Sequence, residues 1–282
     1  MLDDETLLKV GQSFYIPPRP EVLVRIQEIA GQPEPDVNAL VRAVTSDVAL
    51  SGAVLKTLNS PAFGFRMRID NIHQATMLLG IRKITALATG FLIRQAFKGK
   101  SASISLEDFW ERSQQSADLI YFIGDKTDLK RYVPLETLYT IGLFHNAGQA
   151  AMAIRFPDYD QTLAWADAHP EARLVDIEDQ RYHTDHAVVS FYLARSWGLP
   201  DNVLKIILCH AREEFLEADL PLPDSMAMAA LMMTRAFQFR WKHFEEAPFW
   251  LAHQAAVTEL IGLTPDDVLD LREDAEARLF GQ

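Results

Sequence analysis

Helical periodicity is the feature that most constrains the fold of this chain. Apolar residues recur at helical spacing along almost all of its 282 residues, and residues that begin or end helices stand between these segments. No segment alternates convincingly between apolar and polar residues, as a half-buried strand would. Hydrophobic residues make up 49% of the chain, and a chain of this length can bury a large core without metals or disulfides. The sequence therefore predicts an all-α protein.

The first hundred residues contain several helix boundaries. After a proline-rich loop at 16–20, the expected boundaries are a C-terminal cap at Gly31, an N-terminal cap at Asp36, another N-terminal cap at Ser46 and a stop at Pro61. Two further apolar segments run up to Gly80 and from Ile84 to about Phe97. The polar, serine-rich stretch at 98–105 is the expected boundary between two lobes.

The second part of the chain begins with a helix that we expect to be capped by Ser105. Pro134 opens the next helix, expected as one continuous segment from Leu135 to about Ile154, and this helix is apolar on nearly every side. Such a helix is expected to run through a core. Further helices are expected at about 185–196, 201–211, 224–239 and from 264 to the C-terminus.

Charge and cysteine content indicate a compartment and exclude some partners. The formal net charge is −12, a poor profile for a protein that wraps DNA or an anionic membrane. The charge is uneven, because residues 1–100 carry +3 and residues 101–282 carry −15. Cys209 is the only cysteine, the N-terminus is acidic, and the longest uninterrupted apolar run is too short to span a bilayer. We therefore expect a cytoplasmic protein with no membrane partner.

Histidines are the main candidates for chemistry. His145 and Asn146 stand in the middle of the most apolar expected helix, His183 and His186 lie three residues apart, and His210 ends another apolar helix. A single histidine in an apolar helix is more often a hydrogen-bonded core residue than a ligand. These histidines fall on or beside consecutive helices, however, and helical bundles commonly build sites from facing side chains.

The order of short motifs along the chain resembles the HDOD family, a degenerate relative of the HD metal-dependent phosphohydrolases. The match covers about residues 14 to 215. Its motifs are Ile16-Pro17-Pro18-Arg19-Pro20, Val44-Thr45-Ser46-Asp47, Leu58-Asn59-Ser60-Pro61, Ile69-Asp70-Asn71-Ile72, Phe109-Trp110-Glu111-Arg112-Ser113, Phe144-His145-Asn146-Ala147-Gly148, Asp185-His186-Ala187 and Trp197-Gly198-Leu199-Pro200.

The resemblance implies a two-lobed helical module whose N-terminal helical lobe packs on an HD-like lobe. We assign the module to residues 14–215, with the N-terminal lobe at 14–100 and the HD-like lobe at 101–215, and residues 216–282 to a helical extension of the HD-like lobe. Modules of this family mostly serve bacterial signalling and regulatory pathways. The resemblance thus implies a regulatory protein with a signalling protein as its partner.

The residues that would hold a metal in an HD enzyme are altered in this sequence. The resemblance implies a His, a His-Asp pair and a later Asp as ligands of a divalent metal. Arg112 or its neighbour Ser113 replaces the first His, and Asn146 replaces the first Asp. Arginine cannot ligate a metal, and a neutral amide lacks the charge that hard cations need. We therefore expect no catalysis, no cofactor and a degenerate pocket formed by Arg112, His145, Asn146, His186 and His210.

Three alternatives remain open at this stage. A small anionic ligand could bind beside Arg112 and gate the protein. Alternatively, His145, His186 and His210 could still bind a transition metal and act as a residual phosphohydrolase on nucleotides or cyclic dinucleotides. A nucleic-acid-binding regulator would use the basic residues of the first lobe, although we do not expect nucleic acid as the partner. Those residues are Arg66, Arg68, Arg82, Lys83, Arg94, Lys98 and Lys100.

Overall fold

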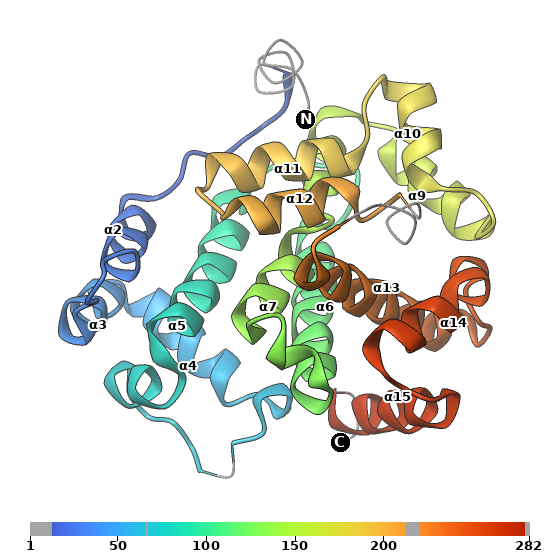
Figure 1. Ribbon diagram of the computed structural model, residues 1–282. Coiled ribbons are helices and arrows are strands. Elements are labelled where there is room, and N and C mark those ends of the chain that lie inside the picture. Colours follow the sequence, from blue (N-terminus) through green and yellow to red (C-terminus); the bar gives the residue numbers. More distant parts are fainter. Residues whose placement is uncertain (1–12, 66, 213–219, 280–282) are drawn as a thin grey trace. The chain divides into compact units, whose positions relative to one another are not determined.

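A computed structural model describes residues 13–65, 67–212 and 220–279 of the chain. Within these ranges every regular element is helical, so the all-α prediction is confirmed (Figure 1). The chain divides into two compact units, unit 2 at residues 18–98 and unit 1 from the remaining residues on either side. The module boundaries at 14, 100 and 215 stay predictions. Arg66 and the boundary at 215 lie outside the described residues.

Unit 2 contains four α-helices and a short 3₁₀ turn. They are α2 (Glu21–Ala30), α3 (Val37–Thr45), α4 (Val48–Leu58), η1 (Pro61–Phe63) and α5 (Ile72–Phe97), and α2, α3 and α4 all pack on α5. Asp36 caps α3 as expected, accepting a hydrogen bond from Asn38 N at 2.8 Å. The expected cap at Ser46 is wrong. Ser46 ends α3, and Asp47 caps α4 by accepting from Leu50 N at 3.0 Å.

Helix α5 is bent within unit 2. Gly80 has φ 81° and ψ 162°, values that only glycine adopts readily, and they separate a first part of the helix from a second. By length and composition α5 is the one described helix that could span a membrane. Core helices of soluble proteins meet the same criterion, and Ile84, Leu87 and Ile93 of α5 are buried inside the unit. The expectation of no membrane partner stays a prediction.

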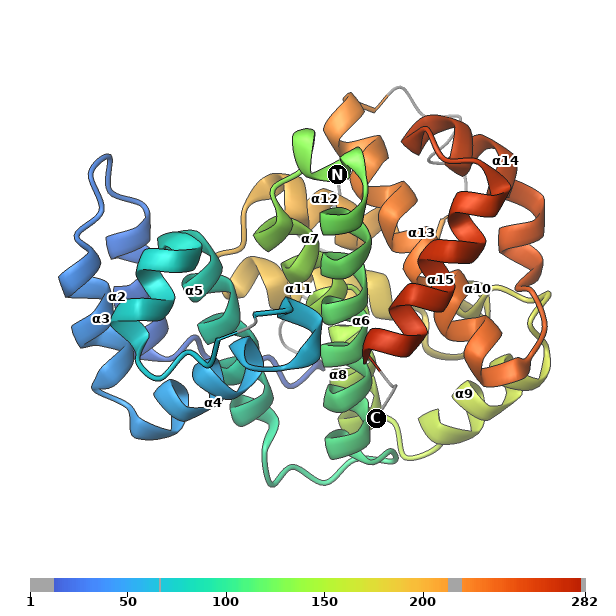
Figure 2. The same cartoon turned by 90° about the horizontal axis from the view of Figure 1, so that it is seen from below.

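Unit 1 contains the remaining helices. They are α6 (Leu106–Lys126), η2 (Asp128–Arg131), α7 (Leu135–Phe144), α8 (Ala147–Arg155), α9 (Tyr159–Ala168), α10 (Leu174–Tyr182), α11 (His186–Ser196), α12 (Asp201–Cys209), α13 (Leu222–His243), α14 (Pro248–Ile261) and α15 (Pro265–Leu279). Helices α6 and α7 pair along their length, α11 packs against α8 and α12, and α15 lies along α6 (Figure 2). Ser105 caps α6 as expected, accepting from Asp108 N at 3.2 Å.

The expected single helix from Leu135 to Ile154 is wrong. The structure has two helices there, α7 and α8, and the chain breaks between them at His145 and Asn146. Asn146 leaves helical geometry with φ −102° and ψ 6°, which turns the chain before α8 begins. The most apolar segment of the sequence therefore bends at His145 and Asn146, two of the candidate site residues.

Candidate functional site

His145 and Asn146 take their positions from the bend between α7 and α8. His145 is the C-terminal cap of α7, directly after Phe144, and is 2% exposed; its Nδ1 donates a hydrogen bond to the carbonyl oxygen of Gly142 at 2.8 Å. A carbonyl can only accept, so Nδ1 carries the proton and Nε2 carries the lone pair when the ring is neutral. Asn146 follows at the start of α8 and is half-buried.

Two glycines let the helices around this bend approach closely. A Cβ at Gly142 would lie 2.8 Å from Ala117 Cα on α6, and a Cβ at Gly148 would lie 2.2 Å from the carbonyl oxygen of His186 on α11. Gly148 N also donates to Ser190 Oγ at 2.7 Å. These contacts explain why glycine is required at both positions, and the second brings Asn146 to the beginning of α11.

His186 is held by a buried carboxylate. Asp185 caps α11 by accepting from Val188 N at 2.8 Å, and His186 is the first residue of that helix. Glu178 of α10 is fully buried, and its Oε2 accepts from His186 Nδ1 at 2.6 Å and from His186 N at 2.9 Å. The other oxygen of Glu178 accepts from the Tyr159 hydroxyl. The carboxylate thus has donors on both oxygens, as a buried carboxylate requires.

His210 completes the group from the end of α12. It is 4% exposed, and its Nδ1 donates to the carbonyl oxygen of Ile207 at 2.6 Å. Its own carbonyl oxygen accepts from Arg235 Nη1 at 3.0 Å. Arg235, on α13, therefore brings a positive charge beside the histidines.

The three imidazoles meet in the interior of unit 1. His210 Nε2 lies 3.3 Å from His186 Nε2 and 3.2 Å from Asn146 Oδ1, and the His145 ring stands edge-on to the His210 ring at 5.1 Å between centroids. We call His145, Asn146, Glu178, His186 and His210 the histidine cluster. Both Nδ1 atoms of the close pair donate elsewhere, so a hydrogen bond between the two Nε2 atoms requires one ring to be doubly protonated.

The electrostatics of the cluster disfavour a charge on two of its rings. Burial, with the Arg235 charge next, lowers the pKa of His145 to about 3. Burial and the neighbouring His145, His186 and Arg235 charges also hold the pKa of His210 well below its usual range. Both rings are therefore neutral.

The cluster does not fit the divalent metal of HD enzymes. Hard cations need several carboxylate oxygens, yet the oxygen next to the Nε2 atoms is the neutral amide of Asn146. Glu178 binds the opposite side of His186, at Nδ1. Within the part of the chain that the structure describes, no group of three or more His, Cys, Asp or Glu side chains is arranged for a metal ion.

Two predicted participants lie elsewhere. The side chain of Arg112 is exposed on α6, whereas the neighbouring Ser113 is buried and donates to the carbonyl oxygen of Phe109 at 3.0 Å. Successive helical residues point about 100° apart, so only one of the two can face the interior. His183 is exposed at the end of α10, where its φ of 56° places it in the left-handed region. Neither side chain joins the histidine cluster.

Three residues of the site were not predicted from the sequence. Glu178 and Tyr159 support His186, and Arg235 supplies the cation that Arg112 was expected to supply. Glu178 stands in a polar segment without an apolar period, so nothing in its local sequence signals burial. Its fully buried state depends on contacts of α10 with α9 and α11.

A small cleft in unit 1 is lined in part by residues that are close in sequence to the histidine cluster. It has a volume of about 320 Å³, and its lining includes Asp185, directly before His186, and Arg212, two residues after His210. Arg173, Asp176 and Asp179 also line it, and Arg173 is paired with Asp176 through Nε at 2.8 Å. Carboxylates outnumber guanidinium groups in this cleft, so its charge does not favour an anion.

Comparison with known proteins gives the family. The HDOD domain model matches residues 16–213. A Treponema pallidum protein, described only as uncharacterized, is 25% identical over 219 residues, which are 76% of this chain and 41% of that protein, so the chain spans less than half of that relative's length.

Solved structures share the fold. An HDOD domain protein of unknown function from Geobacter sulfurreducens is 19% identical, with a TM-score of 0.69 and 99% coverage of both chains. A Marinobacter aquaeolei protein, provisionally described as a signal transduction protein, is 22% identical with a TM-score of 0.69, over 100% of this chain and 60% of that one. A Shewanella amazonensis protein, provisionally described as a phosphohydrolase, has the same identity and TM-score and is matched over 94% of its length. The matched motifs, the all-helical fold and the family model agree that this chain belongs to the HDOD domain family.

Proposed function

We propose that this protein is a non-catalytic regulatory module of signal transduction that acts by binding a protein partner. The observation that carries the proposal is the hydrogen bonding of the histidine cluster. Every imidazole Nδ1 of the cluster has an acceptor, Glu178 has donors on both oxygens, and the Nε2 atoms of His186 and His210 lie 3.3 Å apart. A site whose polar groups bind one another in this way supports structure rather than hydrolysis.

The position of Asn146 supports the same proposal. In an HD enzyme the equivalent carboxylate would add negative charge to the metal site. Here the amide lies against a neutral His210, with Arg235 close behind, so the local charge opposes the binding of a cation. The cluster then serves to tie α7, α8, α10, α11 and α12 together. The binding of a protein partner would then depend on the exposed surfaces of the helices.

Gating by a small anionic ligand gains no support from these contacts. The expected anion-binding residue, Arg112, is exposed away from the buried rings, and the neighbouring cleft carries more carboxylates than guanidinium groups. A protein partner alone is therefore the simpler proposal.

Hydrolysis assays on the full chain test the proposal. The substrates are bis-p-nitrophenyl phosphate, ATP and a cyclic dinucleotide, each with added Mn²⁺, Fe²⁺ or Zn²⁺. We expect the same background rate from the wild type, from His145→Gln and from His183→Ala, whose exposed histidine makes it the matched control. Turnover that is lost in His145→Gln and kept in His183→Ala would overturn the proposal.

A residual metal-dependent phosphohydrolase is the second candidate, and one distance favours it. Two ligand nitrogens about 2.0–2.1 Å from a tetrahedral ion lie about 3.3–3.4 Å apart, and the two Nε2 atoms are 3.3 Å apart. Nδ1 hydrogen bonds of the kind seen on all three rings are also typical of metal-bound histidines. His186, His210 and Asn146, with His145 beside them, would then hold Zn²⁺ or a similar ion.

Zn²⁺ binding separates the two candidates. Metal-free protein is heated with and without Zn²⁺, and its metal content after purification is measured by mass spectrometry. We expect no Zn²⁺-dependent rise in melting temperature beyond that of His186→Gln, because Arg235 stands beside the rings and Asn146 adds no negative charge to them. A stoichiometric ion and a rise that His186→Gln abolishes would favour the metal site.

A further inference from the structure

Unit 2 has a preformed groove on its surface, which is exposed and partly apolar, whereas the histidine cluster is buried and polar. One wall is the exposed face of α4, with Gly52, Leu55 and Lys56, and the other is the segment with Phe65, Met67 and Arg68. The groove has a volume of about 760 Å³. We call it the α4 groove. All of its lining residues belong to unit 2.

The wall opposite α4 is fixed by Asn59. Its Nδ2 donates to the carbonyl oxygens of Leu55 and Ile69, each at 2.8 Å, and its Oδ1 accepts from Ile69 N at 2.8 Å. Ile69 itself is buried at 2% exposure. One side chain thus ties the second wall to the last turn of α4. A groove held open by such bonds needs no ordering before a partner binds.

Apolar side chains are exposed along this groove. Met67 is 74% exposed and Phe65 is 37% exposed, and both line the groove. Exposed apolar groups that gather around a groove mark a binding surface more often than scattered ones do. Methionine is suited to such a surface because its unbranched side chain adapts to different partners.

Gly52 gives an independent reason to expect a partner. It lies inside α4, where glycine costs about 0.5–1 kcal/mol relative to alanine. A Cβ at Gly52 would meet no atom within 4 Å, so nothing in the described part of this chain requires glycine there. Without a side chain at this position, the backbone of a bound helix can approach α4 closely. Gly142 and Gly148 show the contrary case, in which the chain's own packing fills the space.

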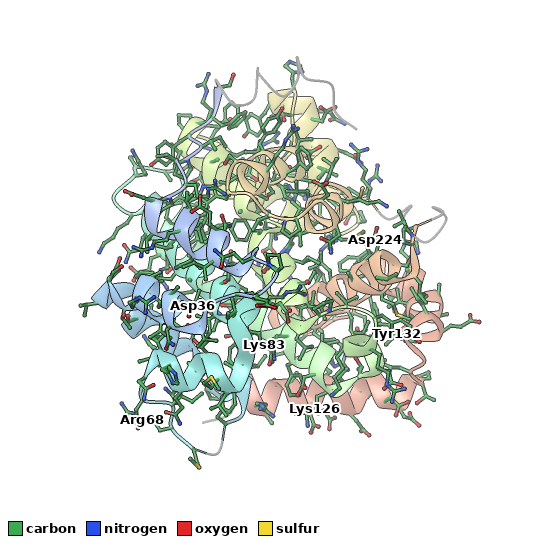
Figure 3. All side chains as sticks on the ribbon, turned by 60° about the vertical axis from the view of Figure 1, so that its left-hand side comes forward. Asp36, Arg68, Lys83, Lys126, Tyr132 and Asp224 are labelled. Atoms are coloured by element: carbon green, nitrogen blue, oxygen red, sulfur yellow. The ribbon has the colours of Figure 1, made fainter. Side chains whose placement is uncertain are left out.

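Charge selects the class of partner. Unit 2 has 10 Lys and Arg against 6 Asp and Glu, a net charge of +4 in a protein whose net charge is −12. Lys56 lies on the α4 wall, and Arg68 on the other wall extends into solvent, where it contacts Asp70, the one acidic residue of the lining, at 3.2 Å (Figure 3). The lining is therefore net positive, so an acidic partner is attracted to it and a basic partner is repelled.

We propose that the α4 groove binds an acidic amphipathic helix of a partner protein. The apolar face of that helix would lie on Met67, Phe65 and the α4 wall at Gly52, and its carboxylates would face Lys56 and Arg68. This is the helix-in-groove mode of recognition. The proposal names the partner class for the regulatory function proposed above and rests on that function for its biological meaning. Its test, however, is a binding measurement that hydrolysis does not influence.

Fluorescence anisotropy of labelled peptides on the full chain tests the proposal. The probe is a synthetic 18-residue peptide of Leu, Ala and Glu with Leu at helical spacing. One control has the same composition with the Leu positions scrambled, and a second has Lys in place of Glu. We expect saturable binding of the acidic amphipathic peptide alone. Equal binding of the scrambled or the basic peptide, or no binding of the acidic one, overturns the proposal.

Two methionine variants locate the site. Met67→Glu is expected to weaken binding of the acidic peptide about tenfold or more, because it adds like charge in the groove. Met77→Glu is the matched control, since Met77 is 65% exposed in the same unit but does not line the groove. Its binding is expected to stay within about twofold of the wild type. Equal losses in both variants overturn the assignment to the groove.

Other occupants are outcomes of the same experiment. A dimer in analytical ultracentrifugation that Met67→Glu dissociates would assign the groove to a second copy of this chain. Salt-sensitive binding of a labelled DNA duplex that Lys56→Glu abolishes would assign it to nucleic acid. Either result overturns the proposal of an acidic helix. Circular dichroism of each variant confirms that it is folded.

Discussion

The histidine cluster buries polar side chains, whereas the α4 groove exposes apolar ones. In the cluster, polar and charged groups lie inside unit 1 and find partners there, so that Glu178, His186 and His210 bind one another. In the groove, apolar groups such as Met67 stay at the surface of unit 2. A buried polar network stabilises the fold in which it lies. An exposed apolar surface becomes stable only when something covers it. The difference supports a structural role for the first region and the proposed recognition role for the second.

Removal of the buried Glu178 carboxylate should destabilise the protein more than any other change considered below. In Glu178→Ala, the Tyr159 hydroxyl, His186 N and His186 Nδ1 all lose their acceptor. We expect the free energy of unfolding to fall by about 3–5 kcal/mol, because each of the three buried donors left without an acceptor costs about 1–3 kcal/mol. All five tryptophans lie in unit 1, so urea unfolding followed by tryptophan fluorescence reports on this unit.

Asp179→Ala is the control for that measurement. Asp179 is the next residue on α10, but its side chain is exposed. Its replacement should change the free energy of unfolding by no more than about 0.5 kcal/mol. Equal effects of the two replacements would mean that Glu178 has no special role in the cluster.

Gly148→Ala should disturb the same cluster through its backbone. The new Cβ would lie 2.2 Å from the carbonyl oxygen of His186 and 2.6 Å from Ser190 N, and backbone atoms cannot move aside as flexible side chains do. We expect a loss of about 1–3 kcal/mol in the free energy of unfolding, the usual cost of overpacking. The tryptophan fluorescence assay measures it. A neutral result would show that α8 can shift away from α11 without cost.

The sequence predicts the helical fold well because each signal is local. Caps at Asp36 and Ser105 are set by one side chain and the first turn of its own helix, and both form as expected. Ser46 and Asp47 show the limit of this method. Two capping residues stand side by side, and the sequence does not show that Ser46 still belongs to the preceding helix.

The site is predicted less completely because its geometry depends on distant contacts. His145, His186 and His210 do come together, as the resemblance implies. The bend at Asn146 was missed because the apolar pattern continues past it, and the contact of Gly148 with α11 is invisible in the local sequence. Glu178 was missed for the same reason. Its burial comes from the packing of a short helix rather than from a pattern.

The pH dependence of stability should sharpen the view of a buried cluster. The pKa of His145 is about 3 in the folded protein, against 6.5 ordinarily, and that of His210 is also lowered. The unfolded chain therefore binds more protons between pH 6.5 and 5, and these histidines lower stability as the pH falls. Each contributes a slope of up to about 1.4 kcal/mol per pH unit.

Asp118 opposes this trend. Burial raises its pKa from 3.8 to about 7, so the folded protein binds its proton first and Asp118 adds stability as the pH falls through 7. We expect a net slope of about 1.4 kcal/mol per pH unit in the wild type and about twice that in Asp118→Asn. Urea unfolding at pH 6.5, 5.8 and 5.0 measures both. An unchanged slope in Asp118→Asn would contradict the assignment.

Gly52→Ala should have the smallest effect on stability and the opposite sign from Gly148→Ala. The new methyl group meets no atom within 4 Å, so the helix gains the usual alanine advantage of about 0.5–1 kcal/mol without a clash. Unit 2 contains no tryptophan, so hydrogen exchange of the α4 amides is the suitable measurement. The same methyl group stands on the α4 wall of the groove, where it should weaken binding of the acidic peptide. A variant that is more stable and binds less well would show that Gly52 favours peptide binding at a cost in the stability of α4. A variant that is more stable and binds equally well would mean that the peptide does not contact the α4 wall at Gly52.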